Sequence, residues 1–512
     1  MLLHRILLTA LTMSIFVSTP AMSTTYEEID IDRIYTKQYD MKLMNDGSVI
    51  WVNGTKIHRK KDGHTETIWD NYSNIDNFLI NENGVALWEA LELLPSGSLV
   101  QTLYFYDGEA IHKLDYLPDE MLFFGGGGGG LTLLPGLFKL YFTSHKITSD
   151  GKAIWVTQTT RTECALKYFD GTTVNIIREE YPCRHKNEVD MGWGFDLDLA
   201  LFGSFKTNDQ GQIVWIGRFP ESDLNTEVRG EVYFFDGTTT TRLTHTAEYE
   251  RFPVINNQGQ LAWVSVDEQN KRSLSIYTES GIVELADSAD SVNYVINDNN
   301  QVAWLLNNNE LYFYESDIVL NLPTQGEIHN LQLNNGGWLS WNNESYDLFL
   351  YKEGKLNSHI NHEYMGGFGR ELLKANVLNN GHAFVPTKRY SGDGDIFYYN
   401  GEEFENITGI EETSELKSNP DKYTETAKTT WVTFESATYD PVAGCHYYLQ
   451  RKYMWINIFD GTEVYRHRHN SLLENPCEEF VKIVDINDQG DVLFFVRHSE
   501  WAYDLKLLKS TP

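Results

Sequence analysis

One short phrase ends on a tryptophan seven times in this chain, and it uses seven of the thirteen tryptophans present. In its fullest form the phrase is a turn of the type Asn-Asp-x-Gly followed by an alternating strand that closes on Val-Ala-Trp or a variant. Self-similarity at a spacing of tens of residues indicates a repeat architecture, in which each repeat is one supersecondary unit packed on its neighbours. The copies end at Trp51, Trp88, Trp155, Trp215, Trp263, Trp304 and Trp341.

The unit between residues 251 and 285 shows the pattern of one repeat. It contains four short runs, rich in β-branched or aromatic residues and bounded by Asn, Asp or Gly, which is typical of antiparallel strands. The first turn carries Asn and Gly because both accept the positive φ of tight hairpin turns. A second turn, Asp-Gly or Asn-Gly, is a strong hairpin signal, so each unit is predicted to be a four-stranded meander. This second turn recurs at residues 107–108, 170–171, 236–237, 400–401 and 460–461.

The number of units sets the predicted fold. Weaker copies near residues 378–381 and 486–490, and a degenerate one over 431–461, bring the total to about ten. Four-stranded units of about 40 residues are propeller blades. We therefore predict an all-β β-propeller of about ten four-stranded antiparallel units, in a single large ring or in two rings. The last unit lacks a fourth strand after residues 502–508, and the run at 29–36 is the candidate to supply it.

The repeat resembles the Tol-B-type β-propeller family, a fold-level likeness to the six-bladed superfamily. The resemblance rests on the Asn/Asp-x-x-Gly-x-Val-Ala-Trp strand, the Tyr-x-Tyr-Asp-Gly strand and the ending Arg242-Leu243-Thr244, and it covers residue 40 to the end. The family's Trp-Ser-Pro-Asp-Gly turn is replaced here by Ile-Asn-Asp/Asn-x-Gly. The resemblance implies the fold and does not select a function, since this architecture serves scaffolds, peptidases, lyases and receptors.

Residues 1–23 have the pattern of a secretory signal peptide. His4 and Arg5 precede an apolar run over 6–17, and small residues allow cleavage after Ala21 or Ser23, as in removable export signals. A retained membrane anchor is disfavoured because the run is well short of about 20 residues. We therefore predict a secreted or periplasmic protein, with a propeller domain over 24–512 and insertions near 89–146, 156–206 and 402–430.

The net charge of -32 limits the class of partner. A surface this acidic repels phosphate backbones and anionic lipids, so nucleic acid is not expected to bind. A protein or a glycan remains the expected partner. The sequence does not predict an oligomeric state.

Four cysteines in an exported chain predict disulfides. Three connectivities are possible, and the local one joins Cys164 with Cys183 and Cys445 with Cys477. In each local pair, one cysteine precedes an Asp-Gly turn and the other follows it. Neither spacing matches a zinc site, which uses close Cys-x-x-Cys pairs.

Other conspicuous residues give no cofactor or metal site. The tryptophans recur at one position of the repeat and are expected in the core, not on a sugar-binding platform. Six glycines at 125–130 lack the strand and helix of a dinucleotide site. The uncharged segment 121–138 around them is expected either to fold back on the ring or to meet a partner or a membrane. His467 and His469 are too few for a metal site, and the arginines beside them oppose a cation.

The functional expectation follows from a chain almost wholly used by structural repeats. The sequence contains neither the Gly-x-Ser-x-Gly elbow of a serine hydrolase nor a phosphate-binding loop. The leading expectation is an exported propeller that binds a protein or glycan without catalysis. The alternative is a lyase or glycosidase acting on polysaccharide, with its site in the central funnel.

Overall fold

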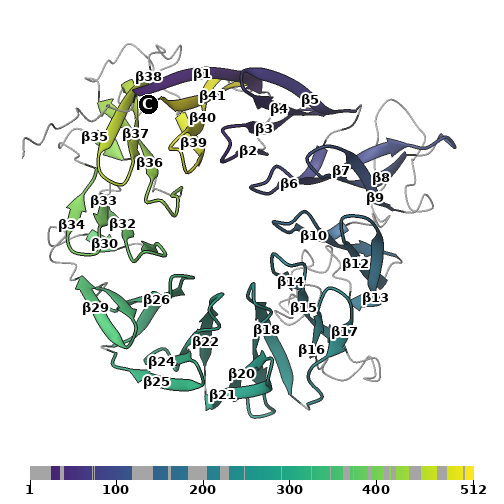
Figure 1. The fold of residues 1–512 in the computed structure, drawn as a ribbon, viewed down its shortest axis with the longest axis vertical. Coiled ribbons are helices and arrows are strands. Elements are labelled where there is room, and N and C mark those ends of the chain that lie inside the picture. Colours follow the sequence, from purple (N-terminus) through teal and green to yellow (C-terminus); the bar gives the residue numbers. More distant parts are fainter. Residues whose placement is uncertain are drawn as a thin grey trace, which may run out of the picture.

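A computed structural model describes most of the chain as one ring of strands (Figure 1). Within the described residues, the strands form ten antiparallel sheets and there is no helix of the length and apolarity that a membrane crossing requires. The predicted all-β propeller is confirmed, as a single ring of ten blades. The described residues are 25–34, 40–71, 73, 75–97, 99–117, 142–159, 163–182, 205–218, 230–246, 248–289, 291–324, 326–345, 347–360, 370–372, 374–389, 395–408, 414–416, 422–436, 451–469, 481–499 and 502–511.

Each blade runs from an innermost first strand to an outermost fourth strand. Blade 1 contains β2 (Met41–Leu43), β3 (Val49–Asn53), β4 (Lys56–Lys61) and β5 (His64–Asp70). Blade 2 contains β6 (Ile75–Ile80), β7 (Ala86–Leu93), β8 (Leu99–Tyr106) and β9 (Ile111–Tyr116). Blade 3 contains β10 (Phe142–Ile147), β11 (Ala153–Gln158), β12 (Glu163–Phe169) and β13 (Val174–Pro182). Blade 4 contains β14 (Phe205–Thr207), β15 (Ile213–Arg218), β16 (Gly230–Phe235) and β17 (Thr240–Arg242). Blade 5 contains β18 (Tyr249–Ile255), β19 (Leu261–Val266), β20 (Arg272–Thr278) and β21 (Gly281–Ala289). Blade 6 contains β22 (Val292–Ile296), β23 (Val302–Leu306), β24 (Glu310–Glu315) and β25 (Ile318–Leu322).

The remaining blades follow the same plan, with the first strand of blade 8 divided in two. Blade 7 contains β26 (Ile328–Leu333), β27 (Leu339–Asn343), β28 (Leu348–Lys352) and β29 (Lys355–Ile360), and blade 8 contains β30 (Arg370–Leu372), β31 (Asn376–Val377), β32 (Ala383–Arg389), β33 (Ile396–Tyr399) and β34 (Phe404–Asn406). Blade 9 contains β35 (Ser414–Leu416), β36 (Thr429–Ser436), β37 (Arg451–Phe459) and β38 (Val464–His469), and blade 10 contains β39 (Val481–Ile486), β40 (Val492–Ser499), β41 (Ala502–Thr511) and β1 (Thr25–Ile34).

The ring closes by pairing the two ends of the chain. Strand β1 runs antiparallel to β41 from Thr25 opposite Thr511 to Ile34 opposite Tyr503, and it lies on the outer side of blade 10 (Figure 1). This confirms that the N-terminal run supplies the missing fourth strand. Closure removes the free edge that β41 would otherwise expose.

The repeated tryptophans form the core, as predicted. Six of the seven are at most 1% exposed and Trp341 is 3% exposed. Several stack on the aromatic residue directly opposite on the third strand, as Trp215 does on Tyr233 with ring centroids 5.6 Å apart and an interplanar angle of 13°. Such pairs stabilise by more than the burial of their area.

The leading asparagine of the repeated first turn acts through its side chain, whereas the sequence predicted that it would supply a positive φ. The glycine or its replacement has positive φ, as at Gly84 (φ 78°) and Asn300 (φ 59°), whereas the leading asparagine does not. The side-chain oxygen of that asparagine instead caps its own turn: Asn256 Oδ1 accepts from the backbone N–H groups of Gln258 and Gln260 at 3.0 and 2.8 Å. The expectation of positive φ is therefore correct for the glycine and wrong for the leading asparagine.

The same asparagines join neighbouring blades. In six of the ten blades the side-chain Nδ2 donates to a backbone carbonyl in the turn of the next blade, at 2.7 to 3.2 Å. We call this set of bonds the asparagine belt. It runs from Asn81 to Thr148, Asn208 to Asn256, Asn256 to Asn297, Asn297 to Asn334, Asn334 to Leu378, and Asn487 to Met44.

The order of strands gives the ring two different ends. The first turn of every blade and the third turn of blades 1 to 9 lie at one end, with the asparagine belt, and we call this end the turn face. The connections from second to third strands and from each blade to the next lie at the opposite end, the loop face, because consecutive strands are antiparallel.

Candidate functional site

Two blades break the repeat at a position in the core. The residue that follows the repeated tryptophan, or the phenylalanine replacing it in blades 8 and 10, is apolar in eight of the ten blades. In blade 2 it is Glu89 and in blade 7 it is Asn342, and these side chains are 5% and 2% exposed. Burying a carboxylate or an amide where the fold accepts an aliphatic residue costs stability, so these two positions are candidates for function. The apolar residues are Val52, Val156, Ile216, Val264, Leu305, Val385, Val432 and Phe495.

The Glu89 carboxylate is held by amide groups from two strands. Asn77 of β6 donates from Nδ2 to Oε1 at 2.7 Å, and Gln101 of β8 donates from Nε2 to Oε2 at 3.2 Å. On the blade 3 side, the imidazole Nδ1 of His145 lies 3.8 Å from Oε1. Glu89 is therefore oriented by its own blade and faces an imidazole of the next blade.

The protonation of His145 follows from its other ring nitrogen. His145 Nε2 lies 2.9 Å from the backbone carbonyl oxygen of Asn77, which only accepts, so Nε2 carries the proton in the neutral ring. Burial lowers the pKa of His145, while the bond to Asn77 acts in the opposite direction. Nδ1 is then an unprotonated lone pair, buried and without a hydrogen-bond partner among the described residues. The unprotonated Nδ1 of His145 thus faces Glu89 Oε1 across a gap of 3.8 Å.

A bulge in the innermost strand connects this buried pair to the channel. The β6–β7 ladder shifts register between Asp76 and Leu79, and Asn77 at the shift has φ of 51°. Asp76 and Asn77 are both exposed. The exposed residue Asn77 is thus tied to Glu89 through its side-chain amide and to His145 through its backbone carbonyl.

A second carboxylate from blade 1 adds to the charge of this region. Asp40 lies just before β2, and its Oδ2 is buried with no hydrogen-bond partner among the described residues. Burial raises the pKa of Asp40, and the negative charge of Asp76 raises it further. We call Asp40, Asp76, Asn77, Glu89 and His145 the blade 2 cluster.

Blade 7 repeats part of this arrangement. Its first strand β26 shifts register between His329 and Gln332, and Asn330 at the shift has φ of 55° and donates to Asn342 Oδ1 at 3.2 Å. Asn342 Nδ2 is buried without a hydrogen-bond partner in the described part of the chain. Strands β6 and β26 lie on opposite sides of the ring opening (Figure 1), so the two polar exceptions come from opposing walls of the channel.

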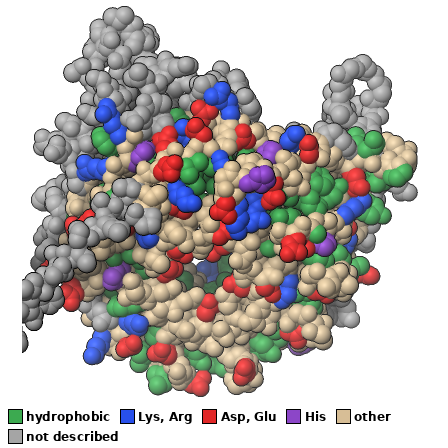
Figure 2. Space-filling model, turned by 45° about the horizontal axis from the view of Figure 1, so that its top comes forward, with side chains coloured by type: hydrophobic (Ala, Val, Ile, Leu, Met, Phe, Trp, Pro, Cys, Tyr) green, Lys and Arg blue, Asp and Glu red, His purple; other side chains and the backbone are tan. Residues whose placement is uncertain are grey.

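Acidic, basic and histidine side chains surround a hollow in the middle of the visible face (Figure 2). Over the described residues, no group of three or more His, Cys, Asp or Glu side chains is arranged to hold a metal ion.

Only part of the residues singled out in the sequence can be placed. Cys164 is buried in β12, whereas Cys183, Cys445 and Cys477 lie outside the described residues, as does the segment 121–138 with its glycines. The disulfide pairing and the role of that segment stay predictions. His467 Nε2 lies 3.0 Å from Glu28 Oε2 of β1, at the closure of the ring.

The blade 2 cluster was missed at the sequence level. Glu89 was visible as a carboxylate where five of the other six copies that end on tryptophan have an aliphatic residue, and this comparison between repeats would have found it. Nothing in the local sequence pairs His145 with Glu89, because the two residues belong to different blades.

Comparisons with known proteins place the chain only at the level of the fold. No protein-family model matches it, and neither does any curated protein. Among solved structures, it is similar to a prolyl endopeptidase (11% identity, TM-score 0.35, 71% of this chain and 54% of that chain). It is also similar to Porphyromonas gingivalis dipeptidyl peptidase 4 (12%, 0.42, 89% and 64%). The β-propeller domain of the Trilobed protease from Pyrococcus furiosus is a third such structure (10%, 0.32, 65% and 99%).

These neighbours contradict the function expected from the sequence. Their propellers belong to peptidases, so the expectation of a non-catalytic binding module for a protein or glycan, with a polysaccharide lyase or glycosidase as alternative, is wrong by this comparison. The chain spans 54% of the prolyl endopeptidase and 64% of the dipeptidyl peptidase. At these identities and TM-scores the likeness concerns the fold alone, and the chemistry of this chain rests on its own side chains.

Proposed function

We propose that this propeller is a hydrolase of peptides or related amides, with the blade 2 cluster as its acid–base site. The observation that carries the proposal is the Glu89–His145 pair, in which a buried lone pair and a carboxylate oxygen face each other at 3.8 Å. Groups with environments that push their pKa values apart are typical of acid and base partners in catalysis. In this cluster burial lowers the pKa of His145 and raises that of Asp40.

The proposed reaction is the addition of water to an amide bond. The Glu89–His145 pair takes a proton from water as the water oxygen bonds to the amide carbon. The carbon–nitrogen bond then breaks, and the leaving nitrogen receives a proton, for which Asp40 is our candidate donor. The proton taken from water restores the donor, so the site ends in its starting state.

The exposed part of the cluster favours a substrate with a free amino group. Asp76 and Asn77 are consecutive exposed residues with a carboxylate and an amide, and a carboxylate binds an ammonium group while an amide binds a peptide group. The amino terminus of a peptide offers both groups on adjacent atoms. Acetylation of that terminus should therefore weaken binding.

The proposal is tested by incubating the full chain with a mixture of short peptides, each present with a free and an acetylated amino terminus. We expect products by mass spectrometry from the free peptides, and a fall of kcat by about 10²- to 10⁴-fold in Glu89→Gln, the range for loss of a general base. Glu82→Gln removes an exposed carboxylate of the same blade and should leave kcat unchanged.

A second variant separates catalysis from folding. Glu89→Val restores the residue type of the other blades, and we expect it to melt no lower than the wild type while losing activity, because function often retains residues that cost stability. The proposal fails if no peptide is cleaved, or if Glu89→Gln cleaves at the wild-type rate.

Other features remain proposals from the sequence. They are membership of the Tol-B-type family, export directed by residues 1–23, the pairing of Cys164 with Cys183 and of Cys445 with Cys477, and contact of residues 121–138 with a partner or membrane. Peptide mapping without reduction tests the disulfides directly.

A further inference from the structure

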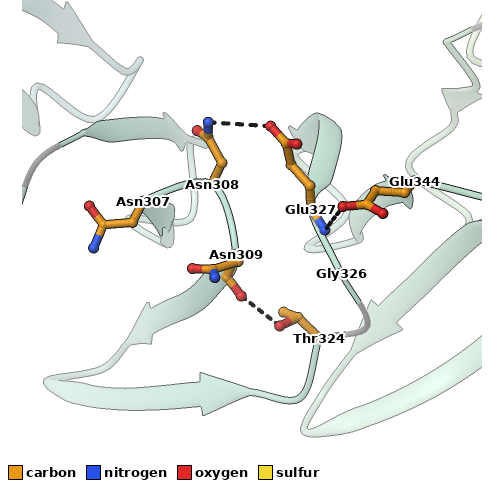
Figure 3. Close-up of a pocket in the computed structure, with 7 residues that line it drawn as sticks. All are labelled: Asn307, Asn308, Asn309, Thr324, Gly326, Glu327 and Glu344. Carbon is orange, nitrogen blue, oxygen red and sulfur yellow. Dashed lines mark hydrogen bonds between the residues drawn. The ribbon is translucent and has the colours of Figure 1, made fainter.

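A polar pocket opens at the loop face between blades 6 and 7. Its volume is about 560 Å³, within the range of sites that hold small molecules. Asn308 and Asn309 reach it from the connection after β23, Thr324 and Glu327 from the connection between the blades, and Glu344 from the end of β27 (Figure 3). Three separate connections thus converge on one cavity, which we call the blade 6–7 pocket.

Three hydrogen bonds join the connections that line the pocket. Asn308 Nδ2 donates to Glu327 Oε1 at 3.4 Å, the backbone N–H of Glu327 donates to Glu344 Oε1 at 3.2 Å, and the Thr324 hydroxyl donates to the Asn309 carbonyl at 2.6 Å (Figure 3). The second oxygen of each carboxylate has no hydrogen-bond partner among the described residues. The pocket therefore offers two carboxylates, with a formal charge of -2, and none of its lining residues is basic.

The size of the pocket selects among cations. A single metal ion needs a close shell of ligands at about 2.0 to 2.6 Å, and the cavity is far larger than such a shell. A guanidinium group presents five N–H donors in one plane and pairs with carboxylates in a fixed fork. An ammonium group has three donors on one point, so it uses fewer of the acceptors that this wall offers.

We propose that the blade 6–7 pocket binds the guanidinium group of an arginine side chain, with Glu327 and Glu344 as the charged acceptors and the Asn308 and Asn309 oxygens as further acceptors. The inference stands apart from the proposed hydrolase activity, because it concerns binding and not turnover. Glu327 leads directly into β26 and Glu344 directly follows β27. The pocket is thus next to the exposed His329 and Asn330 of the channel wall on the same pair of strands.

Isothermal titration of the full chain with Nα-acetyl-arginine amide tests the inference. We expect one saturable site, no binding of the citrulline analogue, which keeps the shape without the charge, and weaker binding of the lysine analogue. Glu327→Gln combined with Glu344→Gln should weaken binding at least about tenfold, the effect of losing roughly 1.4 kcal/mol of interaction.

A matched control removes the same charge elsewhere. Glu82→Gln combined with Glu279→Gln neutralises two exposed glutamates outside the pocket and should bind as the wild type does, with unchanged melting temperatures in both double variants. Equal binding of arginine and citrulline analogues, or equal losses in the two double variants, would show only attraction to an acidic surface and would overturn the inference. Glu89→Gln should bind normally, so failure of the hydrolase proposal and failure of the pocket are distinguishable.

Discussion

At the scale of single residues, the structure gives Glu250 an unusual environment. It lies at the start of the first strand of blade 5 and is 3% exposed, and its carboxylate accepts from the Ser265 and Thr246 hydroxyls at 2.6 and 2.9 Å. Burial raises the pKa of Glu250 to about 7, with these hydroxyls acting against the rise. The neighbouring Glu231 is also buried, and it is paired with Arg242 at 2.9 Å. Blade 5 therefore contains a carboxyl group that titrates near neutral pH.

This gives a prediction for stability against pH. A group with a folded-state pKa above its unfolded value contributes stability that is complete below the unfolded pKa and is lost as pH rises through the folded pKa. For Glu250 the window runs from 4.5 to about 7, and the loss is at most about 3 kcal/mol. Glu250→Gln should therefore gain stability relative to wild type as pH rises from 5 to 8 in urea unfolding. The control Glu279→Gln should differ from the wild type in unfolding free energy by an amount that does not change with pH. The same constant difference for Glu250→Gln would refute the prediction.

At the scale of elements, the asparagine belt explains how ten small sheets keep one arrangement. Each belt asparagine shapes its own turn with the side-chain oxygen and holds the next blade with the side-chain nitrogen. Blades 3 and 9 use Thr148 and Thr424 instead, which keep the first role: their hydroxyls accept from the backbone N–H of Lys152 and Lys428 at 2.9 and 3.2 Å. A threonine offers no equivalent donor to the next blade. The native chain thus contains blades that have this bond to the next blade and blades that lack it.

The two roles can be separated at Asn256. Asn256→Thr should keep the turn and lose the bond to the Asn297 carbonyl, at a cost of about 1 kcal/mol, whereas Asn256→Ala should lose both and cost about 2 to 3 kcal/mol. Urea unfolding of the two variants and the wild type measures these differences. Equal losses for threonine and alanine would mean that the bond between blades adds nothing.

At the scale of the whole molecule, the ring depends on one strand from the far end of the chain. Strand β1 is held to blade 10 by ion pairs, with Arg33 Nε 2.9 Å from Asp504 Oδ1 and Lys506 Nζ 3.0 Å from Glu28 Oε1. It also contacts blade 1, because Asp32 accepts from the indole N–H of Trp51 at 2.9 Å. One strand therefore joins the last blade and the first.

Removal of residues 24–35, which include β1, should break the connection between blade 10 and blade 1. The edge of β41 would be exposed, and the apparent melting temperature should fall by roughly 5 °C or more. A synthetic peptide of residues 24–35, added in excess, should restore much of the loss by mass action, and a scrambled peptide should not. A truncated protein that melts with the full chain would show that β1 is not needed to hold the ring.

The sequence by itself determined the repeat, the four-stranded unit and the burial of the tryptophans, because these depend on local turn chemistry and on a hydrophobic period written in every copy. It also contained Glu89 as a break in the pattern. Only the tertiary structure decided that the ten units form a single ring, that Asn256 bonds beyond its own turn, that Asn77 holds Glu89, and that His145 faces Glu89. Those contacts join residues of different strands or blades, and their geometry depends on how the sheets pack around the channel, which no local pattern encodes.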